Sequence, residues 1–200
     1  MKELIVITTP YFYPDEASLL TLLFEEGMMR LHLRKPGCDP TGLESLLNQI
    51  PSAYYSRIVL HDCFGLALER GLGGIHLNRR NPVAPPDYRG SISRSCHTLD
   101  EVNQYKPSCD YVFLSPIFQS ISKEGYGSGF PIEELRQAGR LGQIDRQVIA
   151  LGGISAQAIA KIKEIPFGGY AVLGDIWGSD PSLLRADHIT QHFKELQTWL

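Results

Sequence analysis

The stretch Arg57–Leu77, RIVLHDCFGLALERGLGGIHL, holds a complete strand–helix–strand unit. Its first residues, Arg57–His61, form a short apolar run rich in β-branched side chains, which predicts a buried strand. The segment that follows is predicted to be a helix closed by Gly71. A second apolar run, Gly74–Leu77, is the next strand. Strand–helix alternation requires the strands to run parallel, so the unit predicts an α/β fold built on a parallel sheet.

The same alternation continues on both sides of this unit. Six further runs are predicted to be strands: Leu4–Ile7, Met29–Arg34, Ser91–Ser95, Tyr111–Leu114, Gln147–Leu151 and Tyr170–Leu173. A count of eight strands with eight crossovers favours closure into a (β/α)8 TIM barrel over an open sheet. We therefore expect one compact barrel domain over residues 1–200, with no linker or second domain.

Helix start signals precede several of the crossovers. Asp39 is followed by proline at the first helical position, and Thr98 begins a capping box. Ser155 and Asp180 are the predicted N-caps of two later helices. The fourth crossover contains Pro85-Pro86 and is expected to be short or irregular.

Composition and charge restrict the class of protein. The chain has 200 residues, 43% of them hydrophobic, which suffices for one well-buried domain. A net charge of -3 argues against nucleic acid as a partner. The four cysteines form no C-x-x-C pair, and neither a signal peptide nor a membrane-length apolar run is apparent. We expect a cytoplasmic protein without membrane partners, and the sequence leaves a homo-oligomer open.

In a barrel of this kind the site lies at the carboxyl ends of the strands. The residues at these positions are mainly cations, hydroxyls and glycines: Arg34, Lys35, His61, Asp62, Asn78, Arg79, Arg80, Ser95, Ser120, Ser122, Lys123, Gly152, Gly153 and Gly174. Cations and backbone N–H groups at exposed glycines bind phosphate or pyrophosphate, as do helix N-termini. Asp62 is the one acid of the set and a candidate ligand for magnesium.

The loop after the sixth strand is the strongest single candidate for anion binding. Ser120, Ser122 and Lys123 alternate hydroxyls with a cation, and Gly125 and Gly127 supply conformational freedom. Such a loop can close over a phosphate group. The alternative is a surface loop without a ligand.

Other members of the set also have structural alternatives. Asp62 has the position of a helix N-cap as well as that of a metal ligand. His32 and His76 alternate with apolar neighbours and are more typical of satisfied core histidines than of catalysts. Arg79 and Arg80 can be a solvated pair on a loop. The shared position of these residues at one rim favours the site hypothesis.

Five motifs, taken in order, carry a resemblance to a known family. They are HLRK at His32–Lys35, HDCFGLALERGLGGIHL at His61–Leu77, SCHTLDEV at Ser95–Val102, DYVFLSPIFQSISK at Asp110–Lys123 and ALGGI at Ala150–Ile154. Together they resemble the thiamine phosphate synthase superfamily, which also contains the thiazole tautomerases. The resemblance implies the same barrel. It also implies a transferase of thiamine biosynthesis that joins hydroxymethylpyrimidine diphosphate to thiazole phosphate and releases pyrophosphate, with Mg2+ as cofactor.

The resemblance also implies roles for individual residues. Arg34, Lys123 and Ser95 correspond to catalytic residues, with Lys123 on the pyrophosphate. Asp62 corresponds to a magnesium ligand, and Asn81 stands at the second metal position. The implied substrate- and phosphate-binding residues are His32, His61, Arg79, Arg80, Ser120, Ser122, Gly153, Leu173 and Gly174.

The chain departs from the synthase pattern at several positions. His32 replaces glutamine on the second strand, His61 replaces asparagine, and Asn81 replaces the second acid. The tautomerase branch carries a histidine at the position of Pro116. Three hypotheses therefore remain: a synthase-like transferase, a thiazole tautomerase-like isomerase, and a non-catalytic relative that binds a thiazole or thiamine phosphate.

Overall fold

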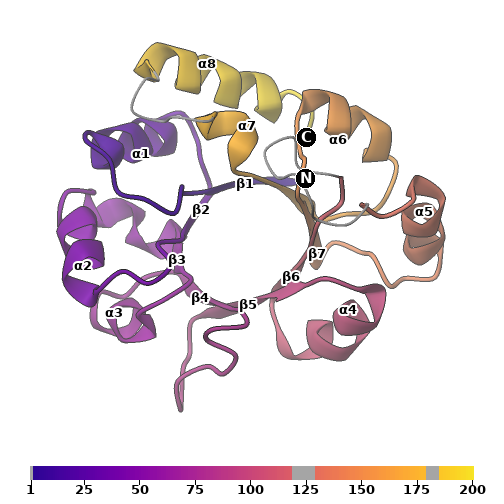
Figure 1. The fold of residues 1–200 in the computed structure, drawn as a ribbon, viewed down its shortest axis with the longest axis horizontal. Helices are drawn as coiled ribbons and strands as arrows, with labels where there is room; N and C mark the ends of the chain where they lie inside the picture. The colour runs from indigo at the N-terminus through magenta and orange to yellow at the C-terminus, as the bar shows by residue number, and fades with distance from the viewer. Residues whose placement is uncertain (1, 119–128, 179–184) are drawn as a thin grey trace.

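A computed structural model shows a closed barrel of eight strands in sequential order (Figure 1), and it describes residues 2–118, 129–178 and 185–200. Each strand pairs in parallel with the next, and β8 pairs with β1. The predicted TIM barrel is confirmed. No helix of the described ranges combines the length and the apolar character needed to cross a membrane.

The strands agree with the predicted apolar runs to within one or two residues. They are β1 Glu3–Ile7, β2 Arg30–Leu33, β3 Ile58–Leu60, β4 Gly74–Leu77, β5 Ser91–Cys96, β6 Tyr111–Leu114, β7 Val148–Leu151 and β8 Gly169–Val172. The helices around them are α1 Glu16–Glu25, α2 Pro40–Asn48, α3 Phe64–Glu69, α4 Leu99–Tyr105, α5 Ile132–Arg140, α6 Ala156–Ile162, α7 Gly174–Trp177 and α8 Ala186–Gln197. Two short 3-10 helices, Ser52–Arg57 and Lys106–Ser108, precede β3 and β6.

Three predicted N-caps act as expected. The side chains of Asp39, Thr98 and Ser155 each accept a hydrogen bond from a backbone N–H in the first turn of α2, α4 and α6. Each cap satisfies a donor that the helix itself leaves unpaired. The segment between β4 and β5 contains no helix, which agrees with the irregular crossover that the prolines predict, and it projects outward from the barrel (Figure 1).

Two helices, α3 and α7, differ from the prediction. The N-cap of α3 is Cys63, in a left-handed conformation, so the alternative role of Asp62 as N-cap is wrong. Helix α8 begins at Ala186, whereas the expected cap Asp180 lies outside the described residues. The one-turn helix α7 was not expected, and its Trp177 Nε1 donates to the Ile7 carbonyl at 2.7 Å.

The barrel interior divides into an apolar part and a polar part. Strands β1, β6, β7 and β8 fill one side with a cluster of buried hydrophobic side chains: Ile5, Ile7, Tyr111, Phe113, Ile149 and Ala171. Strands β2 to β5 contribute buried polar groups instead, among them His32, His76 and Ser93. Their neighbours Leu31 and Leu33 face the outer core between sheet and helices. Because buried polar groups need hydrogen-bond partners, the polar part of the interior must be held by specific hydrogen bonds as well as by packing.

Candidate active site at the barrel mouth

The carboxyl ends of β2, β3, β4 and β5 bring several predicted residues together. Arg34 follows β2, His61 and Asp62 follow β3, and Arg80 lies in the turn after β4. Ser95 is the last residue but one of β5. Since these four strands are neighbours in one parallel sheet, their ends meet at one side of the mouth.

Asp62 is held between a guanidinium and an amide. Arg80 Nη2 lies 3.2 Å from each carboxylate oxygen of Asp62, and Asn81 Nδ2 donates to Oδ1 at 2.9 Å. The side chain of Asp62 is 12% exposed and that of Arg80 is 46% exposed. The carboxylate therefore lies at the floor of the mouth, while the guanidinium faces solvent.

The turn after β4 is fixed to the end of β3 by two asparagines. Asn78 Nδ2 donates to the carbonyls of His61 at 2.8 Å and His76 at 3.1 Å, and Asn81 Nδ2 also donates to the His61 carbonyl at 3.0 Å. Asn78 Oδ1 accepts from the backbone N–H of Arg80 at 2.9 Å. The segment after β4 has no helix, and the Asn78 side chain holds its first residues in place instead. This contact also sets the position of Arg80.

Arg34 lies beside the same cluster. Its backbone N–H donates to Thr8 Oγ1 at 2.9 Å, and the Thr8 hydroxyl lies 3.2 Å from the Arg34 carbonyl. Burial lowers the pKa of Arg34, the charge of Arg80 lowers it further, and Asp62 opposes the shift. These influences place two cations and one carboxylate within electrostatic range of each other. The mouth is therefore electropositive and suited to an anion with several charges.

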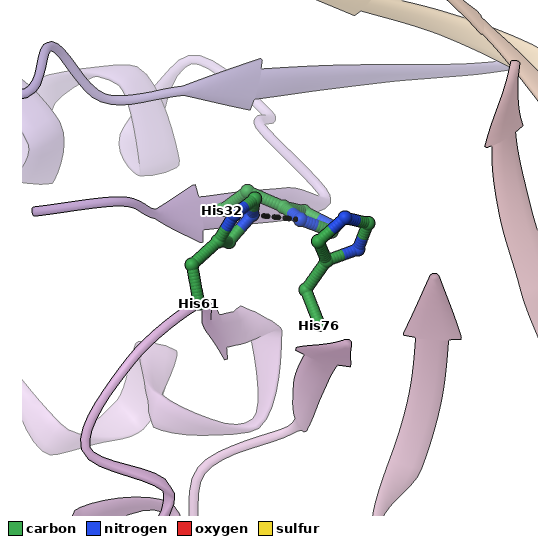
Figure 2. A group of neighbouring side chains, drawn as sticks. All are labelled: His32, His61 and His76. Carbon is green, nitrogen blue, oxygen red and sulfur yellow. Dashed lines mark hydrogen bonds between the residues drawn. The ribbon is translucent and has the colours of Figure 1, made fainter. Parts of the chain in front are cut away.

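Three buried histidines lie next to one another: His32 of β2, His61 directly after β3 and His76 of β4 (Figure 2). His32 Nδ1 shares a hydrogen bond with His61 Nε2 at 2.9 Å, and His32 Nε2 shares one with the Tyr111 hydroxyl at 2.8 Å. His76 shares hydrogen bonds of 2.8 Å with the hydroxyls of Ser93 and Ser95. The rings of His61 and His76 stack, with centroids 4.2 Å apart.

All three imidazoles are neutral at pH 7. Burial lowers the pKa of His32 and His61 well below the usual range and that of His76 to about 3. The charges of Arg34 and other arginines add to the effect. One nitrogen of each ring lies within 4.8 Å of the others, which is close to metal-site spacing. The stacked rings and the positive surroundings, however, oppose a divalent cation there, so the cluster is better described as a hydrogen-bonded core.

The mouth fits magnesium only in part. Asp62 supplies a carboxylate, but both of its oxygens accept from Arg80. The Asn81 side chain donates through its nitrogen and so supports Asp62. Magnesium in proteins is commonly held by one or two carboxylates together with substrate phosphates. The donor set therefore fits a magnesium ion that arrives with a diphosphate, with Asp62 as its carboxylate ligand.

Lys35 does not belong to the mouth, contrary to the sequence-based expectation. Its ammonium is fully buried and forms an ion pair of 2.6 Å with Glu16. It also donates to the carbonyls of Thr9 at 3.1 Å and Tyr11 at 2.6 Å. Burial lowers the pKa of Lys35 and raises that of Glu16, while the ion pair opposes both shifts. Lys35 therefore anchors the loop after β1.

The predicted phosphate turns lie at the ends of β7 and β8, which are neighbours. Gly153 has a φ of 63°, and Gly174 opens α7 with open space where a side chain would be. Gly152 has a φ of 96°, and a Cβ there would lie 2.8 Å from Pro116 Cα, so this glycine is required by the turn itself. Leu173 lies between β8 and α7.

The remaining predicted residues fall into two groups. Arg79 is exposed and makes no side-chain hydrogen bond to any described residue. Ser120, Ser122 and Lys123 lie outside the described residues. The roles assigned to these four residues stay predictions.

Sequence reasoning missed several residues that support the site. Thr8, Ser93 and Tyr111 were not singled out, yet each hydrogen-bonds a residue of the site or the cluster below it. For Ser93 a signal was available, because Ser93 and Ser95 are two apart on one strand and so share the inner face.

Comparison with known proteins agrees with the geometry. The sequence profile described as thiamine monophosphate synthase matches residues 4–176. The thiamine-phosphate synthase of Anoxybacillus flavithermus is 30% identical over 201 residues, which cover 91% of this chain and 85% of the relative. The crystal structure of thiamine phosphate pyrophosphorylase from Bacteroides thetaiotaomicron has a TM-score of 0.89 and 45% identity, covering 98% of this chain and 96% of that one.

Some relatives match over a shorter segment. The thiamine-phosphate synthases of Actinobacillus succinogenes and Latilactobacillus sakei are 30% and 29% identical, and the matches cover 63% and 57% of their respective lengths. The family match nevertheless reaches all eight strands of the barrel, from residue 4 within β1 to residue 176 after β8. The chain belongs to the thiamine monophosphate synthase family.

Proposed function

We propose that the chain is a thiamine-phosphate synthase, which joins hydroxymethylpyrimidine diphosphate to thiazole phosphate and releases pyrophosphate. The observation that carries the proposal is the cluster of Arg80, Asp62 and Asn81 beside Arg34 at the mouth of a barrel of this family. A diphosphate carries several negative charges, and guanidinium groups bind phosphate oxygens in bidentate fashion. Arg34 and Arg80 are the described cations best placed to receive it.

The chemistry follows from the charge that develops. The bond between the pyrimidine methylene and the diphosphate breaks, and the thiazole nitrogen then forms a bond to that carbon. Negative charge grows on the departing oxygens, so donors directed at those oxygens accelerate the step. Arg34 and Arg80 are assigned to this role, together with Lys123 from the loop after β6.

Magnesium supplies further positive charge to the diphosphate when bound, and Asp62 is the residue that would hold it. Within the protein, Arg80 already neutralises Asp62, so a metal competes with that guanidinium unless the diphosphate draws Arg80 away. Binding of metal and diphosphate should therefore be cooperative.

The thiazole phosphate is assigned to the turns after β7 and β8. Backbone N–H groups at Gly153, Leu173 and Gly174 would receive its phosphate, as is common after the last two strands of such barrels. The two phosphorylated substrates are then the protein's small-molecule partners. The cytoplasm is the location that fits this role.

A tautomerase acting on the thiazole alone is not favoured. By the resemblance, His32 matches a histidine that the tautomerase branch carries on the second strand, but His32 is 0% exposed and both of its ring nitrogens are engaged by His61 and Tyr111. Pro116 offers no base at the position where that branch carries histidine.

Pyrophosphate release from the two substrates with Mg2+ tests the proposal. We expect release that needs both substrates, and a fall of at least tenfold in kcat/KM for Arg34→Gln, about the effect of one lost charge-assisted hydrogen bond. Arg140→Gln on the outer face of α5 makes the same charge change far from the mouth and serves as control. Turnover of a thiazole tautomer without pyrophosphate, or saturable binding of thiazole phosphate without turnover, would contradict synthase activity.

A further inference from the structure

A chain of hydrogen bonds below the mouth has a fixed direction, and it begins at a backbone carbonyl. Ser93 Oγ lies 3.2 Å from the carbonyl oxygen of Ile75, which can only accept. Ser93 therefore donates its single proton to Ile75. The same oxygen lies 2.8 Å from His76 Nδ1, so in this contact Ser93 accepts and His76 Nδ1 carries the proton.

The direction continues through the ring to Ser95. A neutral imidazole has one N–H, so protonation at Nδ1 leaves Nε2 of His76 as an acceptor. Ser95 Oγ lies 2.8 Å from Nε2 and must donate to it. Burial, with help from the charges of Arg34 and Arg94, lowers the pKa of His76 to about 3, so the ring stays neutral at pH 7.

The opposite direction makes fewer bonds. If Ser93 donated to His76 Nδ1, then His76 Nε2 would donate to Ser95, and the bond from Ser93 to the Ile75 carbonyl would be lost. The first arrangement makes three hydrogen bonds in this buried place and the second makes two. Since a lost hydrogen bond is costly away from water, the first arrangement prevails.

The strand register holds this arrangement rigidly. His76 of β4 and Ser93 of β5 are direct partners in the parallel ladder. Both side chains are completely buried, whereas Ser95 is partly exposed. His76 and Ser93 therefore touch no substrate, and their effect on the mouth passes through Ser95.

We propose that Ser93 and His76 are positioning residues that keep the Ser95 proton in the hydrogen bond to His76 Nε2. The Ser95 hydroxyl can then only accept a hydrogen bond from the substrate. Ser95 then selects an N–H or O–H donor on the substrate and disfavours a carbonyl or phosphate oxygen at that point. The inference rests on the proposed synthase function for its kinetic consequence. The hydrogen-bond chain itself does not depend on that function.

The tautomer of His76 tests the chain without any turnover. In protein labelled with 15N at histidine, long-range 15N–1H correlation spectra distinguish Nδ1–H from Nε2–H, and His76→Gln identifies the signal. We expect Nδ1–H in the wild type and Nε2–H in Ser93→Ala, which lacks the acceptor. A wild-type His76 protonated at Nε2 would overturn the inference, whether or not the protein releases pyrophosphate.

Kinetics then test the effect on Ser95. We expect Ser93→Ala to lower kcat/KM for the pyrimidine diphosphate about tenfold, the size of one misdirected hydrogen bond, with KM for thiazole phosphate unchanged. Ser91→Ala, at the other end of β5, is the matched control and should behave as wild type. Equal kinetics for the two variants, with both folded as judged by their melting temperatures, would contradict the positioning role.

Discussion

Replacement of Lys35 by methionine should destabilise the fold strongly. The ammonium of Lys35 and the carboxylate of Glu16 are 0% and 2% exposed and lie 2.6 Å apart. Removing the cation leaves a buried, unpaired carboxylate, which costs roughly 3–5 kcal/mol. For a chain of this size, each kcal/mol lowers the melting temperature by roughly 2–4 °C, so the loss should be roughly 6–20 °C.

The double variant Lys35→Met with Glu16→Leu separates structure from function. Replacing both charges by apolar groups removes the unpaired carboxylate, so most of the stability should return. A deficit of roughly 1–2 kcal/mol should remain, because the carbonyls of Thr9 and Tyr11 lose their donor.

Urea unfolding and pyrophosphate release, measured on both variants, show whether Lys35 has a structural or a catalytic role. The double variant should recover kcat/KM together with stability if Lys35 only anchors the loop after β1. A stable double variant without activity would contradict the anchoring role and place Lys35 in the phosphate site.

Three further outcomes are expected. The free energy of unfolding should fall as the pH falls from 6.5 to about 3, because the pKa of His76 is lower in the folded chain than in the unfolded chain. The folded chain then binds fewer protons than the unfolded chain, so acid favours unfolding. Urea midpoints that stay constant from pH 7 to pH 4 would argue against neutral buried histidines. Calorimetry should show magnesium binding weakly alone and more tightly with pyrophosphate, and Asp62→Asn should abolish the difference; equal binding with and without pyrophosphate would exclude the assigned ligand. Gly174→Val places a side chain in open space, so the melting temperature should stay nearly unchanged while the affinity for thiazole phosphate falls roughly tenfold or more. An unchanged affinity would mean that this phosphate binds elsewhere.

The fold was predictable because its signal is local. Parallel strands covered on both faces read as continuous apolar runs, and Tyr111–Leu114 and Val148–Leu151 are of this kind. The caps at Asp39, Thr98 and Ser155 depend on residues three positions apart, so they too are visible in sequence. Helix α7 is one turn long and gives no periodic signal.

The sequence predicted which residues lie at the mouth better than it predicted the contacts between them. Arg34, Asp62 and Arg80 each follow a predicted strand, and the carboxyl ends of parallel strands meet at one rim. Their proximity could therefore be predicted. Burial of Lys35 depends on Glu16, a partner 19 positions away in another element, and no local pattern reveals such a pairing. The bond between His76 and Ser93 depends on strand register, which apolar runs do not specify when both faces are covered.

Pyrophosphate release shows whether this barrel mouth is a synthase site. The purified protein is mixed with hydroxymethylpyrimidine diphosphate, thiazole phosphate and Mg2+, and pyrophosphate is followed over time beside reactions that lack either substrate. We expect release only when both substrates are present, with formation of an equal amount of thiamine phosphate. Absence of pyrophosphate from a folded protein that binds thiazole phosphate would contradict it.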